Sequence, residues 1–120
     1  MTHPRLGDYV GHVIGAIERI QSYVAGLDAA SFASNALIQD AVIRNLEVIG
    51  EACRRIEVRY PSFAIAHPEI PLASAYQMRN AVAHGYFEID FEIVWTTIAN
   101  DLPTLGHALE VALAAEGADS

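Results

Sequence analysis

The sequence predicts an all-α protein, folded as an up-and-down bundle of four to five helices. Valine, isoleucine and leucine recur every three or four residues along most of the chain, which is the spacing of one helix face. No stretch shows a convincing apolar–polar alternation of the kind that marks a half-buried strand. The 120 residues suffice for one domain with a real core but not for two. We therefore expect a single helical domain over residues 1–120, with a frayed tail at about 115–120.

Two long helices are expected in the first half of the chain. Asp8 can cap a helix that runs to about Val24 and is ended by Gly26. Residues 26–35 predict a loop with room for one short turn. A longer helix should follow over Asn35–Arg59. The buried faces are expected to consist of Val10, Val13, Ile14, Ile17, Ile20 and Val24 in the first helix, and of Ile38, Val42, Leu46, Ile49, Cys53 and Ile56 in the second.

The second of these helices also carries a polar stripe beside its apolar face. Arg44, Glu47, Glu51 and Arg55 follow helical spacing, so they can form ion pairs along the helix. Gly50 lies inside the same helix, where glycine costs about 1 kcal/mol relative to alanine. Close packing of a neighbouring helix is the simplest explanation for that glycine.

Prolines mark the middle of the chain. Pro61 ends the long helix, and three prolines within residues 61–71 predict an ordered, non-helical crossing segment. Pro71 suits the first turn of a third helix, which is expected over Leu72–Ala83. Gly85 can terminate that helix.

A fourth helix is expected over Phe91–Ala115, with Asp90 as its cap. Pro103 should kink this helix, because proline removes one backbone donor. The expected core residues here are Ile93, Val94, Trp95, Ile98, Leu102, Leu105, Leu109 and Leu113.

The overall charge limits the kinds of partner that the protein can have. The net charge is −8, and the seven basic residues are all arginine. This argues against binding nucleic acid through a broad basic surface, so any contact with RNA must depend on a few arginines at one site. No apolar run reaches the roughly 18 residues of a membrane span, and the N-terminus lacks the layout of a signal peptide. The single cysteine, Cys53, fits a reducing compartment, so we expect a cytoplasmic protein.

Polar side chains crowd into one short segment, QMRNAVAHGYFEID at residues 77–90. On an ideal helix Arg79 and Tyr86 share one face, because they are seven residues apart. Asn80 and His84 are four residues apart and lie together on the adjacent face. From periodicity alone, such a group is more often a hydrogen-bonded packing feature than a reactive site.

The chemistry of these side chains nevertheless suits phosphate. Arginine offers a planar fork of donors that matches a phosphate, histidine exchanges protons near neutral pH, and asparagine can orient either. No carboxylate cluster or cysteine set accompanies them, so we expect neither a metal nor a cofactor. Arginine plus histidine points to ribonuclease chemistry, in which the 2′-hydroxyl of the RNA attacks the adjacent phosphate. Because one such pair is sparse, we expect a homodimer that brings two copies together across a two-fold axis.

Three segments together resemble one known family. RNAVAHGY at residues 79–86 is similar to the R-x4-H-x-Y signature of the HEPN superfamily, specifically of HepT-like toxins from HepT/MntA toxin–antitoxin pairs. AVIRNLEVIGEACRRI at residues 41–56 resembles the second helix of that family, with its I-G-E-A core. Residues 67–105 resemble the stretch from its proline-rich crossing into its last long helix. Leu72 departs from the pattern, since many relatives have tryptophan there, and we expect this to alter packing rather than chemistry.

The resemblance implies a HEPN-like helical dimer in which two motifs face one another in a cleft. It implies a metal-independent endoribonuclease, the toxin of a type VII-like pair, with Arg79 and His84 as the catalytic residues and Asn80 as a supporting polar residue. Tyr86 matches the tyrosine that an MntA-like nucleotidyltransferase antitoxin modifies with AMP, which silences the nuclease. The alternative function is a non-catalytic helical subunit that binds the nucleotidyltransferase or a nucleotide, and the acidic charge favours it.

One further contact is expected near this motif. Glu51, or Glu47, can orient Arg79 through a bidentate ion pair, since the second and third helices must pack together in so small a bundle. The equally weighted alternative is that both acids pair only with Arg44 and Arg55 along their own helix.

Overall fold

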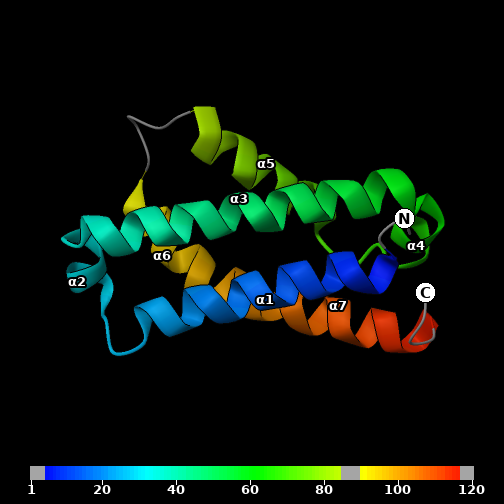
Figure 1. Ribbon diagram of the computed structural model, residues 1–120, viewed down its shortest axis with the longest axis horizontal. Coiled ribbons are helices and arrows are strands. Elements are labelled where there is room, and N and C mark those ends of the chain that lie inside the picture. Colours follow the sequence, from blue (N-terminus) through cyan, green and yellow to red (C-terminus); the bar gives the residue numbers. More distant parts are fainter. Residues whose placement is uncertain (1–4, 85–89, 117–120) are drawn as a thin grey trace.

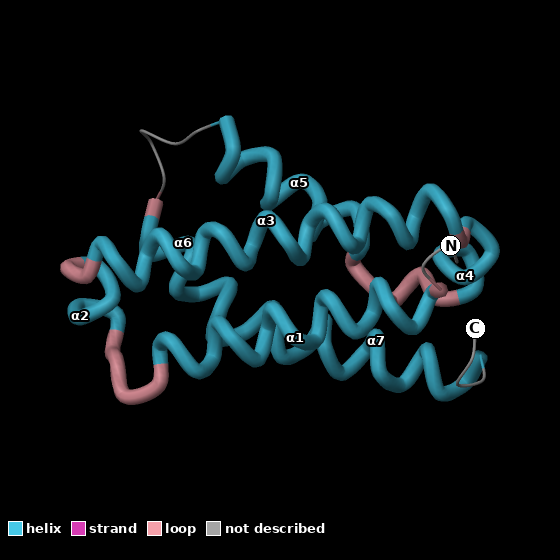
Figure 2. Tube along the Cα trace, viewed as in Figure 1, coloured by secondary structure: helices cyan, strands magenta, loops and turns pink. Residues whose placement is uncertain are grey.

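The structure, a computed structural model, describes residues 5–84 and 90–116, without the side chains of residues 79–84. Every described element is helical, so the expected all-α class is confirmed (Figures 1 and 2). The elements are α1 (Leu6–Val24), α2 (Ala29–Ala33), α3 (Ala36–Arg59), α4 (Pro61–Ala66), α5 (Leu72–His84), α6 (Phe91–Thr96), a π-helical turn (Thr97–Asp101) and α7 (Leu102–Glu116).

Long helices run up and down beside one another. α1 packs along α3 and also against α7, and successive long helices alternate in direction (Figure 1). α5 lies on the outer side of α3, away from α1, and α3 is its main packing partner. None of the described helices is long and apolar enough to span a membrane.

The core lies between α1, α3 and the last helix. The expected faces of the first two helices are confirmed, with Val13, Ile20, Val42 and Ile56 among their fully buried members. Polar side chains also cross this interface, because Arg19 Nε donates to the buried Asn45 Oδ1 at 2.8 Å.

In the last helix the predicted core residues are buried or half-buried, with one exception. Ile93 is 56% exposed, so its assignment to the core was wrong.

Helix starts follow capping chemistry, with one correction. Asp90 caps α6 as predicted, since its Oδ1 accepts from the Glu92 backbone N–H at 2.9 Å. Asp8 does not cap α1, because that helix already begins at Leu6, after Arg5. The Asp8 carboxylate instead reaches back and accepts from the Arg5 backbone N–H at 2.8 Å. An acid in the first turn satisfies the same unpaired donors from inside the helix.

Both connecting segments are partly helical. The first was predicted to be a loop with room for one short turn, and α2 occupies that place, capped by Asp28 through the Ser31 N–H at 2.8 Å. The crossing segment was predicted to be non-helical, which is wrong, because Pro61 begins α4. Proline is tolerated at the first helical position, where its missing N–H would have no partner. Phe63 then anchors the short helix in the core.

The break in the last helix takes a different form from the predicted kink. A π-helical turn over Thr97–Asp101 separates α6 from α7, and the Leu102 N–H bonds to the Thr97 carbonyl. Pro103 follows directly, so the disturbance lies where proline was expected to act.

Gly26 ends the first helix region with φ of +81°, a conformation that favours glycine. Gly85, the expected end of α5, lies outside the described residues.

Candidate active site

α5 is the helix that carries the predicted motif, and buried residues fix its beginning. Ile70 and Leu72 are 5% and 4% exposed, so the chain is anchored on both sides of Pro71. Leu72, the position that departs from the family pattern, therefore packs into the core rather than facing a substrate. From there the helix extends along α3 to His84.

A contact between α3 and α5 lies one turn before the motif. The Arg54 guanidinium lies over the Tyr76 ring, 5.0 Å from its centre, in a cation–π arrangement. Arg54 Nη1 also pairs with Glu57 Oε1 at 3.4 Å, which steers the guanidinium. Tyr76 precedes Arg79 by three residues on α5, so this contact helps to set the rotation of the motif helix.

The predicted reactive residues are placed by the backbone alone. Arg79, Asn80 and His84 all lie within α5, which confirms that they belong to one helix. Their side chains lie outside the described residues, and so does Tyr86 as a whole. The catalytic and modification roles of these residues therefore stay predictions.

The polar stripe of α3 is well described. Glu51 Oε1 pairs with Arg55 Nε at 3.2 Å, and each side chain is about half exposed (48% and 50%). Glu51 thus forms the ion pair along its own helix that was expected as the alternative to a contact with Arg79. A carboxylate has lone pairs for more than one donor, so this pair leaves the contact with Arg79 open as a proposal.

The stripe faces an open groove between α1 and α3, with a cavity volume of about 510 Å³. Arg44, Glu47, Glu51 and Arg55 line one side. His12, on α1, lines the other side, and its ring meets that of Tyr9 edge-on with centroids 6.3 Å apart. In the sequence, His12 lies far from the predicted motif. Only the packing of α1 on α3 brings it to the stripe, and no local pattern signals that contact.

Cys53 is the single cysteine of the chain, and the structure makes it inert. Its side chain is fully buried in α3, and this burial raises the pKa of the thiol to about 12. The thiolate needed for nucleophilic attack is therefore not formed near neutral pH. Cys53 acts as a core residue, as its place on the apolar face predicted.

Comparisons with known proteins agree on one family. A sequence model of that family, described as ribonuclease HepT-like, matches residues 13–112. A probable ribonuclease HepT from Thermococcus cleftensis is 37% identical over 103 residues, which cover 86% of this chain and 91% of the relative.

Two further relatives match at lower identity. A putative RNase from Caldanaerobacter subterraneus is 29% identical, with 81% of this chain and 84% of the relative covered. A Methanocaldococcus jannaschii protein named gamma-glutamylcyclotransferase and putative RNase is 31% identical, and the match covers 81% of this chain but 42% of that relative. No solved structure matches significantly. The family match spans the bundle from within α1 almost to the end of α7, and the chain therefore belongs to the HepT-like ribonuclease family.

Proposed function

We propose that the protein is a metal-independent endoribonuclease, the toxin of a type VII-like toxin–antitoxin pair. The observation that carries the proposal is the family match over residues 13–112, which includes the helix with Arg79 and His84. Membership of a ribonuclease family supports the predicted enzyme class, and the relatives named as ribonucleases support RNA as the substrate.

In the proposed reaction, the RNA supplies its own nucleophile. The 2′-hydroxyl attacks the adjacent phosphorus, the bond to the 5′-oxygen of the next nucleotide breaks, and a 2′,3′-cyclic phosphate remains. His84 takes the proton of the hydroxyl, and His84 of the partner subunit gives a proton to the leaving oxygen. Arg79 stabilises the extra negative charge on the phosphate, and Asn80 orients the group that is bound there.

This scheme requires a homodimer, because a single chain carries one such pair. Sedimentation at micromolar concentration should show a dimer. A single species of 13.0 kDa would leave each active site with one histidine and contradict the scheme.

Glu51 is proposed to support Arg79 from α3. Its carboxylate already accepts from Arg55, and both residues line the groove beside α1. A second donor from Arg79 would tie the polar stripe to the motif helix, with Glu47 as the alternative partner. Glu51→Gln should then reduce cleavage, whereas Asp40→Asn, at an exposed position on the same helix, should leave it unchanged.

Tyr86 is the proposed site of silencing by a partner nucleotidyltransferase. Transfer of AMP from ATP forms a bond between the phenol oxygen and the α-phosphorus and releases pyrophosphate. The adduct adds negative charge two residues from His84, where it would repel an RNA phosphate. Mass spectrometry of the co-expressed protein should find AMP on the peptide that contains Tyr86, and Tyr86→Phe should stay toxic beside the partner.

A non-catalytic helical subunit, which binds the nucleotidyltransferase or a nucleotide, is the second candidate function. The net charge of −8 favours it, because an acidic surface repels RNA. Expression without a partner separates the two functions. A nuclease toxin should arrest growth and cleave RNA in EDTA, and His84→Ala should do neither. Equal growth with both forms would favour the non-catalytic subunit.

A further inference from the structure

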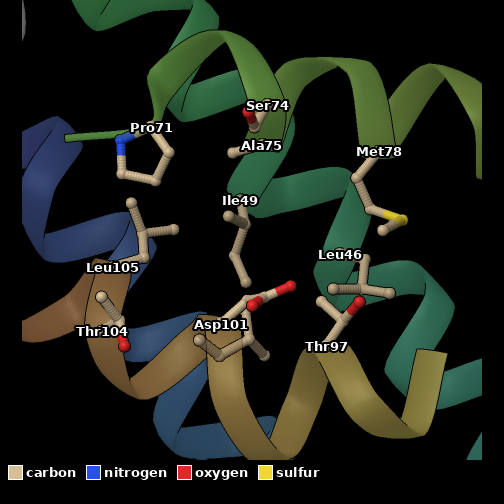
Figure 3. Close-up of a pocket in the computed structure, with 11 residues that line it drawn as sticks. Leu46, Ile49, Pro71, Ser74, Ala75, Met78, Thr97, Asp101, Thr104 and Leu105 are labelled. Atoms are coloured by element: carbon tan, nitrogen blue, oxygen red, sulfur yellow. The ribbon is translucent and has the colours of Figure 1, made fainter. Parts of the chain in front are cut away.

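A cavity of about 320 Å³ lies between α5 and the rest of the bundle (Figure 3). Its walls come from three regions far apart in the sequence: the middle of α3, the first turns of α5, and the π-helical turn with the start of α7. Sites for small ligands have volumes of roughly 300–1,000 Å³, so this cavity is at the small end of that range.

Two irregularities of the fold meet at this cavity. α5 packs chiefly on α3, so its inner side near Ala75 and Met78 is left facing the last helix across a gap. On the opposite wall, the chain bulges into the π-helical turn, which contributes Thr97 and Asp101. Such turns are rare, and those that occur often lie at functional sites. The cavity is therefore a product of the main-chain path and not of one short side chain.

Most of the lining is apolar, the Ser74 hydroxyl lies on the α5 wall, and the polar atoms on the opposite wall are acceptors. Thr97 Oγ1 donates its proton to the Ile93 carbonyl at 2.9 Å, and Thr104 Oγ1 donates to the Asn100 carbonyl at 3.1 Å. Both hydroxyls can then only accept from a ligand. The Asp101 carboxylate points into the cavity, and no ion pair neutralises it within the described part of the chain (Figure 3).

We propose that this cavity binds a small molecule with an apolar body and one cationic group, such as an arylalkylamine. The side chains of Leu46, Ile49 and Leu105 receive the apolar body, and Asp101 pairs with the cation. An RNA phosphate does not fit this chemistry, because Asp101 would repel it. The site is therefore distinct from the one proposed for RNA.

Occupancy of the cavity has a consequence for the motif helix. Ser74, Ala75 and Met78 form one wall, and Met78 directly precedes Arg79. A bound molecule would join α5 to the π-helical turn and stabilise the folded protein in proportion to its concentration. An effect of the bound molecule on RNA cleavage would rest on the proposed function. The binding itself does not rest on it.

Three probes of similar shape and different charge test the proposal on the protein alone. They are 2-phenylethylamine, 2-phenylethanol and 3-phenylpropionate, which are a cation, a neutral molecule and an anion at pH 7. Titration followed by NMR should show saturable binding that shifts Ala75 and Thr97. The cation should bind at least about tenfold more tightly than the anion, as expected for one nearby carboxylate.

Four variants of the protein locate the binding. Asp101→Asn should abolish the preference for the cation, and the matched control Asp40→Asn should retain it, since Asp40 is an exposed acid away from the cavity. Ala75→Leu fills the cavity and should abolish binding of all three probes. Ser74→Leu, at an exposed position of the wall, blocks the cavity in the same way if Ala75→Leu does not fold.

Several outcomes would overturn the proposal. These are no saturable binding by any probe, equal binding of cation and anion, or an unchanged preference in Asp101→Asn. Dissociation of a self-associated form by the probe would mean that a second copy of the chain is the true occupant. Because RNA is absent from these titrations, a failure here is distinguishable from a failure of the nuclease proposal.

Discussion

The three helices α1, α3 and α7 and the motif helix α5 differ in how they are held. Val13, Val42 and Leu109 come from the three helices and are all 0% exposed. In the part of α5 whose side chains are described, Leu72 is buried, whereas Tyr76 and Met78 are only half-buried. α5 rests chiefly on α3 and has a cavity along its other side. The bundle thus supplies the stability, and the helix that carries the chemistry is attached to it from one side.

This division predicts that the largest effect on activity comes from α5 without loss of the fold. Arg79→Lys should slow RNA cleavage by about 100- to 1,000-fold, the usual cost of losing one preorganised donor to a developing charge. Lysine keeps the charge but not the planar fork that matches phosphate. The measurement is the single-turnover cleavage rate, with the urea midpoint recorded in parallel. A fall in stability large enough to explain the lost rate would contradict the division.

The largest effect on stability should come from the other region. Leu109→Ala is expected to lower the free energy of unfolding by about 2–5 kcal/mol, because it opens a cavity among fully packed neighbours. Val111→Ala is the matched control on the same helix, since Val111 is 56% exposed and should change stability by less than about 0.5 kcal/mol. Urea denaturation followed by circular dichroism measures both. Similar losses in the two variants would mean that α7 contributes no specific core.

The same comparison explains which features could be predicted from the sequence. α3 is predicted within one residue at its start and at the same end residue, because its apolar spacing and Pro61 agree, and the structure adds Asn35 as its cap. Asn35 Oδ1 accepts from the Ile38 N–H at 3.0 Å. α4 was missed because Pro61, unlike Pro71, was interpreted only as a helix breaker, although it begins a helix that Phe63 anchors in the core. That anchoring depends on tertiary packing, which local spacing does not contain.

The candidate site was also predictable only in part, because local spacing does not contain tertiary packing. The motif on α5 follows from residue types at fixed spacing within one helix. The groove that adds His12 to the polar stripe, and the cavity that Asp101 faces, arise where distant elements pack together. The position of the π-helical turn could not be predicted from the sequence either. Such a turn adds about one residue to the helical turn and displaces the helix face, but it leaves the local composition unchanged.

A smaller effect is expected at the contact that holds α5 to α3. Arg54→Ala should cost about 0.5–1 kcal/mol, the usual value of an exposed cation–π pair. Arg44→Ala, at an exposed position of the same helix without an ion pair in the described chain, is the control. A double-mutant cycle with Tyr76→Leu should recover the coupling, and Tyr76→Phe should retain it. Coupling near zero would mean that this contact does not hold α5.

The smallest effect should appear as a pH dependence where the two regions join. His67 directly follows α4 in the segment that leads to α5. Its Nδ1 lies 3.2 Å from Glu69, and its Nε2 lies 3.2 Å from Glu116 at the end of α7. The hydrogen bond to Glu116, and then that to Glu69, raises the pKa of His67, and burial opposes them. The folded pKa thus exceeds the unfolded value of about 6.5, so the stabilisation is complete below that pH and disappears as pH rises through the folded pKa. The difference in urea midpoint between wild type and His67→Gln should therefore shrink from pH 5.5 to pH 8.5, and a constant difference would contradict this contact.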